Sequence, residues 1–364
     1  MPDSLTNTHH ITAAEAIRLG LEASLRADDS VFLMGEGVAD PKGIFGTTVG
    51  LVDDFGPARV VEMPVSENGL TGVAIGAAMV GQRPVLIHQR VEFCLLAMEQ
   101  LINNAAKAHY VSNGKHRVPL VVRMIIGRGW GQGPMHSQAL ETLFAAIPGL
   151  KVVMPARPAD AQGLLMGAIE DDNPVCVIEH RWIHYATGDV PIVPRALPLD
   201  GPKRLRNGKD VTIVASSYMT LEARHAATEL AAEGIETDLF DLRIVRPLVL
   251  DEIIASVKRT GRLIVVDTGT RTLGPGAEIA AQVTEACFGD LAAAPVRIGL
   301  PDTPTPSARS LAQVYYPTAA TISDAACKLV GAQEAVATRI SQKLETQRGE
   351  VPFDIPHPAF KGPF

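Results

Sequence analysis

Short apolar runs alternate with longer stretches of helical period along the first half of the chain. The apolar runs are typical of buried strands, and they lie at 31–34, 60–63, 84–88, 119–126, 150–154 and 174–179. The spacing of apolar positions between them predicts helices over 12–27, 70–80, 93–110, 138–146 and 159–169. The first of these opens on a capping box, Thr12-Ala-Ala-Glu15. Such alternation indicates a mostly parallel sheet with helices on both faces.

The same alternation resumes after residue 210. Strands are predicted at 211–215, 237–242, 263–267 and 296–298, and helices at 219–232, 251–260, 275–287 and 318–330. The segment 190–209 between the two halves contains four prolines and the basic cluster 203–206, without a helical period, and is interpreted as a linker. The sequence therefore predicts two doubly wound α/β domains, over 1–189 and 210–332. A polar tail with prolines and phenylalanines, 333–364, follows, and we expect it to be disordered or to lie across a partner.

Composition narrows the class of protein. Of 364 residues, 46% are hydrophobic and 20% are charged, which is enough apolar material for large cores and excludes wholesale disorder. The formal charge of -7 disfavours a nucleic-acid binder. No apolar run is long enough to cross a membrane, and the first ten residues do not resemble a signal peptide. The four cysteines are dispersed without a Cys-x-x-Cys pair, so we expect reduced thiols and a cytoplasmic protein.

Polar residues at strand ends are the first candidates for chemistry. Glu36 lies at the end of one predicted strand, and Glu67 follows another and leads into an almost chargeless helix. Loss of water beside such a helix would favour a Glu67 carboxyl that donates or shares a proton, although an acid at a helix N-terminus is also common for structural reasons. His136 ends a glycine-rich loop, where an imidazole could donate a proton to a ligand. The glycines at 127–133 and 274–276 do not fit a dinucleotide fingerprint.

Several motifs in order carry a resemblance to a known family. They are Met34-Gly35-Glu36, Pro64-Val65-Ser66-Glu67-Asn68-Gly69-Leu70, Gly81-Gln82-Arg83-Pro84, Glu99-Gln100 with Asn104-Ala105-Ala106-Lys107, Gly133-Pro134-Met135-His136-Ser137-Gln138, Pro148-Gly149-Leu150-Lys151-Val152-Val153, Asp241-Leu242-Arg243 with Arg246-Pro247-Leu248, and Gly274-Pro275-Gly276-Ala277-Glu278-Ile279. Together they resemble the β subunits of thiamine-diphosphate-dependent 2-oxo-acid dehydrogenases, from about residue 12 to 331. The resemblance implies a pyrimidine-binding domain followed by a transketolase-type C-terminal domain.

The resemblance also implies roles for individual residues. Glu67 would hold a nitrogen of the cofactor's pyrimidine ring, and Phe93 would stack on that ring. Glu36 would also lie at the cofactor, as an acid that links paired active sites through a proton path. His136 would face the substrate as a hydrogen-bond donor or acid. The reaction would be oxidative decarboxylation of a 2-oxo acid with acyl transfer to a lipoyl group.

What the chain lacks implies a partner. The family holds the diphosphate through a metal bound by a Gly-Asp-Gly motif, and no such motif occurs in these 364 residues. The resemblance therefore implies an α subunit that supplies Mg²⁺ and diphosphate binding, in an α2β2 heterotetramer that could dock on a lipoyl acyltransferase core. Some relatives also bind potassium, and the corresponding residues here are Leu120, Ala168, Asp171 and Asn173.

Two departures from the family pattern leave the substrate open. Ile87 replaces a common acid, and Arg90 replaces an apolar or aromatic residue, so Arg90 together with His136 is a candidate substrate contact. An anionic or phosphorylated substrate would suit Arg90, although a solvated arginine or an ion pair with Glu92 is the simpler interpretation. Two alternatives to the dehydrogenase remain. One is an acetoin-cleaving enzyme or split transketolase that moves a two-carbon unit, and the other is a non-catalytic assembly subunit.

Overall fold

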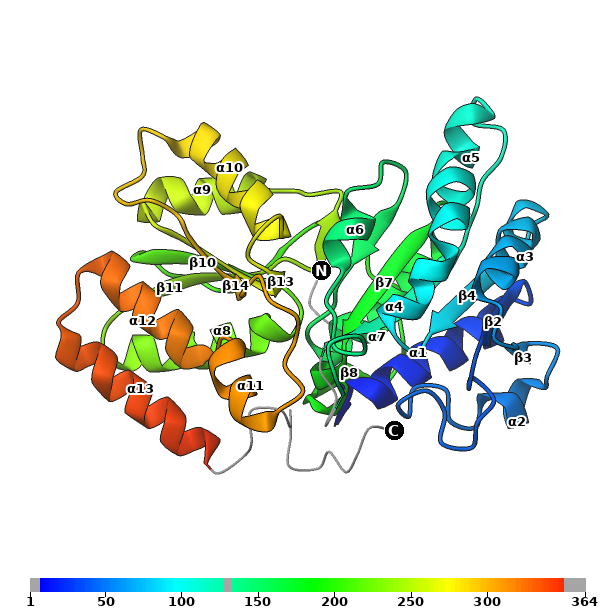
Figure 1. Ribbon diagram of the computed structural model, residues 1–364, viewed down its shortest axis with the longest axis horizontal. Helices are drawn as coiled ribbons and strands as arrows, with labels where there is room; N and C mark the ends of the chain where they lie inside the picture. The colour runs from blue at the N-terminus through cyan, green and yellow to red at the C-terminus, as the bar shows by residue number, and fades with distance from the viewer. Residues whose placement is uncertain (1–6, 128–131, 350–364) are drawn as a thin grey trace. The chain divides into compact units, whose positions relative to one another are not determined.

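The computed structural model describes residues 7–127 and 132–349, and these fall into two units (Figure 1). Among the described residues, the first unit comprises 7–127 and 143–199, and the second comprises 132–142 and 200–349. Each unit is built on its own sheet, and most strand pairs in both sheets are parallel. The predicted fold class, two α/β domains with mostly parallel sheets, is confirmed.

The first unit follows the predicted alternation of strands and helices. Its elements up to the central strand are β1 (Thr8–Thr12), α1 (Ala13–Ala27), β2 (Val31–Gly35), α2 (Leu51–Phe55), β3 (Val60–Glu62), α3 (Glu67–Met79), β4 (Arg83–His88), α4 (Val91–Cys94), η1 (Leu95–Ala97), η2 (Gln100–Ala105), α5 (Ala106–Val111) and β5 (Val121–Ile126). Its remaining elements are α6 (Glu141–Ala145), which begins in the segment assigned to the second unit, then β6 (Lys151–Val153), α7 (Pro158–Glu170), β7 (Val175–His180), η3 (Arg181–Tyr185) and β8 (Thr187–Pro191).

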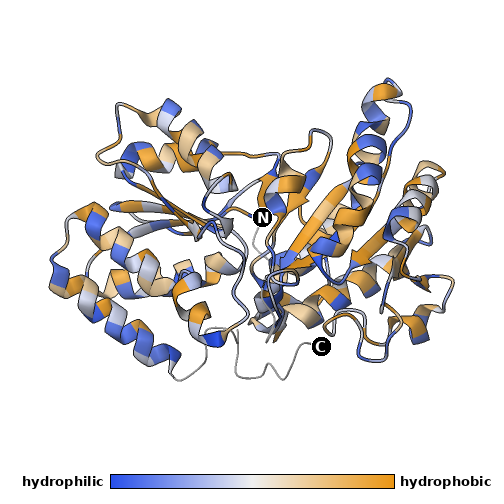
Figure 2. Ribbon diagram, in the orientation of Figure 1, coloured by the Kyte–Doolittle hydropathy of each residue, from blue (hydrophilic) through white to orange (hydrophobic). Residues whose placement is uncertain are grey.

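Within this unit the strand order is β6-β7-β5-β4-β2-β3, with all of these neighbours parallel. Every residue of β5 and β7 is buried, as expected for central strands covered on both faces. Figure 2 shows the hydrophobic colouring of these strands. Because the strands run parallel, their carboxyl ends meet at one edge of the sheet, where ligands of such folds bind.

Two local features of the first unit show where the predicted elements agree with the structure and where they differ. The Thr12 hydroxyl accepts from the backbone N–H of Glu15 at 3.2 Å, so the predicted cap starts α1 as expected. The helix predicted over 93–110 is instead a series of short α, 3₁₀ and π segments. A pattern of apolar positions cannot show these changes of pitch, which depend on packing.

The second unit contains β9 (Lys203–Arg206), β10 (Val211–Ala215), α8 (Tyr218–Ala232), β11 (Thr237–Asp241), β12 (Ile244–Arg246), α9 (Asp251–Thr260), β13 (Leu263–Thr270), α10 (Pro275–Cys287), β14 (Val296–Leu300), α11 (Arg309–Tyr315), α12 (Ala319–Val330) and α13 (Glu334–Arg348). Its sheet has the order β14-β13-β10-β11-β9. The strands are parallel except β9, which pairs antiparallel with β11.

The basic cluster that we interpreted as part of a linker forms the edge strand β9. Arg204 forms an ion pair with the buried Asp238, with an N–O distance of 3.2 Å, and its guanidinium lies 4.8 Å from the centre of the Phe240 ring. Arg259 also bonds the Asp238 carboxylate, at 2.5 Å. The cluster therefore has a structural role in this unit.

The first half of the predicted polar tail is the helix α13. Ile340 and Leu344, one helical turn apart, are buried in the hydrophobic core formed with α8 and α12. The rest of the helix is largely hydrophilic (Figure 2). We expected disorder or a partner because the overall composition is polar, and two apolar residues are enough to attach a helix to its own unit. The end of the predicted tail, 350–364, lies outside the described residues.

Candidate active site

Carboxylates gather at the carboxyl ends of β2 and β3 in the first unit. Glu36 follows β2, and Glu67, the first residue of α3, is only 6% exposed. Burial and the neighbouring charges of Glu67 and Glu62 raise the pKa of Glu36. The structure thus brings Glu36 and Glu67, the two acids predicted from the sequence, close to each other.

The loops that carry these acids are held by side chains from neighbouring strands. The Glu62 carboxylate accepts from the backbone N–H of Gly37 at 2.6 Å and from that of Ala39 at 3.0 Å. The Gln89 side chain, which follows β4, donates to the Glu36 carbonyl at 2.8 Å. These hydrogen bonds fix the backbone of Glu36 from two sides, so that three strand ends form one rigid edge.

Phe93 lies on α4, directly after this edge, and is half-buried. The adjacent Cys94 is buried, and burial together with the charges of Cys176 and Glu67 raises the pKa of its thiol. That interaction places the helix of Phe93 near the Glu67 carboxyl. A buried carboxyl beside an almost chargeless helix, with an aromatic side chain nearby, suits a flat heteroaromatic ring whose nitrogen needs a hydrogen-bond partner. The residues present therefore fit the pyrimidine end of thiamine diphosphate.

Two arginines lie against one aromatic ring in the same unit. The guanidinium of Arg90 is 5.4 Å from the centre of the Phe45 ring, and that of Arg181 is 4.6 Å from it. Arg90 is 5% exposed and Arg181 is 1% exposed. Burial lowers the pKa of Arg90 to about 10, and burial together with the charge of Arg90 lowers the pKa of Arg181 to about 9. Both remain cationic at neutral pH, so this side of the unit attracts negative charge.

Arg181 and Phe45 were not predicted from the sequence. Arg181 directly follows the buried strand β7, and Arg90 lies two residues after the end of β4. A position just after a strand is where ligands of such folds bind, and this position could have indicated Arg181 from the sequence. Phe45 has a left-handed backbone, with φ of 50°, in a loop rich in glycine. Nothing in the spacing of residues indicates that this ring would meet both arginines.

A buried ion pair supports the strand that carries Arg181. Arg123 binds both carboxylate oxygens of Glu179, at 2.5 and 2.8 Å, and His184 bonds the same carboxylate at 2.7 Å. Although burial opposes it, the charge and hydrogen bonds of Arg123, with the hydrogen bond from His184, lower the pKa of Glu179 to about 2. The bidentate geometry holds β5 and β7 together.

His136 belongs to the segment assigned to the second unit and is half-buried. Next to it, the buried Ser137 donates to the Gln132 carbonyl at 3.1 Å, and Gln138 donates to the Met135 carbonyl at 3.0 Å. These bonds give the segment 132–138 a defined local conformation. The preceding residues of the glycine-rich run, 128–131, lie outside the described residues.

The four residues named for potassium lie at the opposite, amino-terminal edge of the first sheet. The Leu120 carbonyl accepts from the Val175 N–H at 2.9 Å, and the Ala168 carbonyl from the Asp171 N–H at 3.3 Å. The Asp171 carboxylate bonds Lys151 and accepts from the Asn173 N–H at 2.9 Å. Although burial opposes it, hydrogen bonds from Lys151 and Asn173 lower the pKa of Asp171. The carboxylate already has a cationic partner, so potassium binding stays a prediction.

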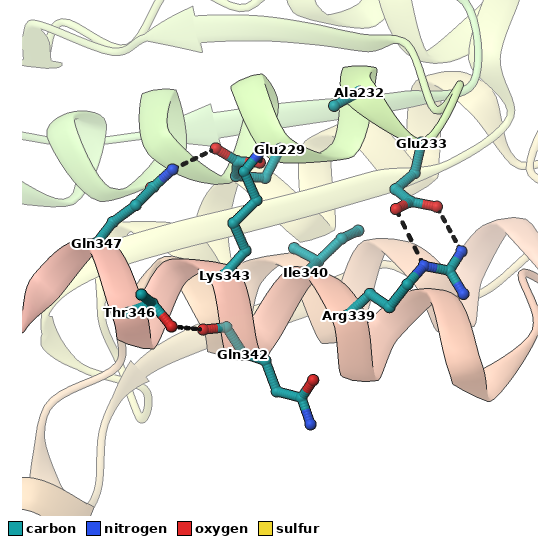
Figure 3. Close-up of a pocket in the computed structure, with 9 residues that line it drawn as sticks. All are labelled: Glu229, Ala232, Glu233, Arg339, Ile340, Gln342, Lys343, Thr346 and Gln347. Atoms are coloured by element: carbon teal, nitrogen blue, oxygen red, sulfur yellow. Dashed lines mark hydrogen bonds and ion pairs between the residues drawn. The ribbon is translucent and has the colours of Figure 1, made fainter.

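A hollow in the second unit lies between α8 and α13 (Figure 3). Arg339 pairs with Glu233 at 2.6 Å, and Lys343 pairs with Glu229 at 2.5 Å, across the two helices. Gln347 also donates to Glu229 at 2.8 Å. The charged groups of the hollow are thus bonded to one another, as at a packing seam between helices, and they do not point to a ligand.

In the part of the chain that the structure describes, no helix is both long and apolar enough to span a bilayer.

Comparison with known proteins identifies the family of both domains. Residues 9–183 match the family described as "Transketolase, pyrimidine binding domain", and residues 202–322 match "Transketolase, C-terminal domain". The chain is 40% identical over 316 residues to the pyruvate dehydrogenase E1 component subunit beta of Rhizobium meliloti (strain 1021), covering 86% of this chain and 69% of that protein.

Two further proteins extend the comparison. The chain is 39% identical over 323 residues to the acetoin:2,6-dichlorophenolindophenol oxidoreductase subunit beta of Cupriavidus necator, covering 86% of this chain and 95% of that protein. A solved structure titled "Split gene transketolase, inactive beta4 tetramer" matches with a TM-score of 0.72 at 23% identity, over 88% of this chain and 98% of that one. At that identity the structural match concerns the fold alone.

Proposed function

Because this chain belongs to the family of β subunits of thiamine-diphosphate-dependent 2-oxo-acid dehydrogenases, we propose that it supplies the pyrimidine half of such an active site. The reaction is oxidative decarboxylation of a 2-oxo acid, with transfer of the acyl group to a lipoyl acceptor. The observation that carries the proposal is the burial of Glu67 at the sheet edge, beside Glu36 and the helix of Phe93.

The chemistry of the site follows from these side chains. When bound, thiamine diphosphate supplies a carbon nucleophile that attacks the carbonyl group of the substrate. The Glu67 carboxyl would hydrogen-bond a nitrogen of the pyrimidine ring, and Phe93 would orient that ring by stacking. The charge of Glu67 favours a protonated Glu36, which can pass a proton along the carboxyl-lined edge. His136 donates a hydrogen bond to the substrate.

We propose an α subunit as the partner, in an α2β2 heterotetramer, with the Mg²⁺ and diphosphate bound by that subunit. A surface for assembly is available on α3, whose only charged residue is Glu67. Val73 on this helix is 58% exposed and Val80 just after it is 80% exposed, and such apolar exposure is typical of interaction sites. No other group lies within 4 Å of a side chain built on Gly76, so this face is open among the described residues. The hydrophobic colour of α3 is visible in Figure 2.

The partner surface can be tested with Gly76→Leu. A Cβ atom at this exposed position meets no other group of the described residues within 4 Å, and leucine improves helix propensity, so the isolated subunit should fold as well as the wild type. Assembly with the α subunit, measured by sedimentation, should be lost. The exposed control Glu285→Leu on α10 should assemble normally. Normal assembly of the Gly76 variant would remove this face from the proposal.

The function is tested by reconstitution with an α-type subunit that carries the Gly-Asp-Gly motif. We expect thiamine diphosphate to bind tightly to the assembled protein and weakly to this chain alone. Turnover of 2-oxo acids should then reduce an artificial electron acceptor, and lipoyl domain should accept the acyl group. Tight cofactor binding by the isolated chain would refute the shared site.

The arginines suggest the kind of substrate. Arg90 and Arg181 together favour a 2-oxo acid that carries a further acidic group, because guanidinium groups bind carboxylates and phosphates. We expect Arg90→Leu to change the ratio of kcat/KM between acidic and neutral 2-oxo acids. The matched control is Arg26→Leu, which removes another arginine lying on a ring, 5.1 Å from the centre of Phe55. Equal ratios in both variants would remove Arg90 from substrate recognition.

Acetoin cleavage is the second candidate, and the 39% identity to an acetoin oxidoreductase β subunit favours it. The same reconstituted enzyme distinguishes the two. Acetoin turnover exceeding that of every 2-oxo acid would favour the second candidate, and a dependence on lipoyl domain would favour the first.

Three finer points complete the proposal. Docking on a lipoyl acyltransferase core is testable by co-sedimentation with that core.

Potassium binding near Asp171 predicts a rise in melting temperature with KCl beyond that with NaCl. A cytoplasmic location is consistent with the four buried cysteines, which form no disulfide, and is testable by cell fractionation.

A further inference from the structure

Glu141 is a carboxyl group that the proposed reaction does not use. It is completely buried, and neither of its carboxyl oxygens has a hydrogen-bond partner in another described residue. Such a group in a folded protein needs an explanation, because a buried polar atom without a partner costs free energy. Glu141 begins α6 and belongs to the segment 128–142 of the second unit, five residues after His136.

The Glu141 side chain packs against the end of β13. A methyl group built on Gly269 would lie 2.2 Å from the Oε1 atom of Glu141, so only glycine leaves room for this carboxyl. The charge of Asp267, from the same strand, acts on Glu141 and raises its pKa. Asp267 is the titratable group that faces Glu141 from β13.

The two acids differ in what surrounds them. Asp267 accepts from the Ser216 hydroxyl at 3.1 Å, the Thr268 N–H at 2.8 Å and the Gly276 N–H at 3.4 Å. Burial raises the pKa of Asp267 and these donors oppose that rise, whereas Glu141 has no donor from other described residues. Burial and the charge of Asp267 raise the pKa of Glu141 to about 8. Glu141 is therefore the member of the pair that keeps the proton at neutral pH.

We propose that Glu141 is a positioning residue, whose neutral carboxyl attaches residues 132–142 to the end of β13 and so holds His136 in place. Ionisation would leave two negative charges side by side without water, and the segment relieves this by leaving the strand. The hydrogen bonds of Ser137 and Gln138 within 132–138 make the segment move as one piece. The importance of His136 rests on the proposed function, but the attachment of the segment does not.

The experiment follows the amide hydrogen exchange of residues 132–142 in the full chain between pH 6 and 9.5. In the wild type, the protection factors should fall at least about 10-fold as the pH rises through the Glu141 titration. In Glu141→Gln, which keeps the shape and cannot ionise, protection should not change with pH. In Gly269→Ala, the methyl displaces the carboxyl, and protection should be low at every pH.

Two further variants refine the test. Asp267→Asn should move the transition to lower pH, because removal of the neighbouring charge makes Glu141 easier to ionise. The control Glu278→Gln, an exposed acid on α10, should behave as the wild type. Wild-type protection that does not change with pH, or the same transition in Glu141→Gln, would overturn the proposal.

Activity provides a second readout in the reconstituted enzyme. The value of kcat should decline above about pH 8 in the wild type, and this decline should be absent in Glu141→Gln. If hydrogen exchange shows the transition but kcat does not decline, the result would support the attachment of residues 132–142 by Glu141. It would contradict the proposed role of His136 in turnover. A decline in kcat that persists in Glu141→Gln would contradict Glu141 as the positioning residue.

Discussion

Acidic residues lie at the carboxyl ends of strands in both mostly parallel sheets, but the groups that surround them differ. At the edge of the first sheet, Glu36 and Glu67 lie close together, and the backbone of Glu36 is held by Gln89. At the edge of the second sheet, Asp267 is held by Ser216 and by the backbone N–H groups of Thr268 and Gly276. At the first edge, burial and neighbouring charges raise the pKa of Glu36, whereas at the second edge Asp267 is surrounded by hydrogen-bond donors of its own unit.

The start of α10 makes this difference clear. In sheets of this kind the N–H groups at a helix start commonly bind an anionic ligand. Here Asp267 of the same unit accepts from the N–H of Gly276 in the first turn of α10. The position of a residue in the fold therefore does not define a ligand site, and the local donors decide whether the position is open.

The largest effect should come from Glu67→Gln. Removing the proton of this carboxyl should lower kcat of the reconstituted enzyme at least about 100-fold, as for loss of an acid–base group. The fold, followed by circular dichroism, should be unchanged because the side chains have the same shape. Glu22→Gln on α1, where Glu22 pairs with Arg26, should retain full activity. Undiminished turnover in the Glu67 variant would remove the first edge from the mechanism.

Glu179→Gln should have the largest effect on stability. It leaves the buried guanidinium of Arg123 without its carboxylate, and breaking such a pair costs about 3–5 kcal/mol. Urea denaturation of the isolated chain measures the loss. Glu233→Gln, which breaks the more exposed pair with Arg339, should cost far less, because water screens that pair. Equal losses in the two variants would contradict the structural importance of the buried pair.

Glu179 also predicts how the first unit responds to acid. Its pKa is about 2 in the folded chain and 4.5 for the ordinary side chain, so the folded state binds this proton less tightly than the unfolded state. The stabilisation is therefore complete above about pH 4.5 and is lost as the pH falls toward 2. The free energy of unfolding should decrease by on the order of 3 kcal/mol over that range. Denaturation curves at successive pH values should show a weaker dependence in Glu179→Gln.

The smallest effect is expected at the seam between α8 and α13. Lys343→Met removes an ion pair with Glu229 whose lysine is 56% exposed, so the cost should be about 0–1 kcal/mol. Ile340→Ala on the same helix removes a buried side chain and should cost about 2–5 kcal/mol. Thermal unfolding of the two variants compares them directly. A larger loss for Lys343→Met would mean that charge, and not burial, holds α13.

Much of the architecture could be predicted from local patterns. The bounds of α9 and α10 coincide with those predicted, because each has clear start and stop signals in the sequence. Strand β9 was missed since its residues are charged, and its partner Asp238 lies far away in the sequence. Helix α13 was missed because its polar composition conceals the two buried side chains, Ile340 and Leu344.

The site could be predicted less completely. The acids at strand ends, Glu36 and Glu67, were found because parallel strands bring their carboxyl ends together. Arg181, Phe45 and Glu141 were not found, because each matters through a neighbour that only the folded chain supplies. Pairs of this kind are set by packing over long separations in sequence, which single-residue patterns do not contain.

Helix α13 matters in practice when the chain is shortened to the residues that the two families match. The match to the C-terminal family ends at residue 322, before α13 begins. A chain cut at residue 333 would lose Ile340 and Leu344 and expose to water the side of the hydrophobic core that α13 covers. Such a shortened protein should aggregate when expressed. Retaining residues up to 349 keeps that side covered.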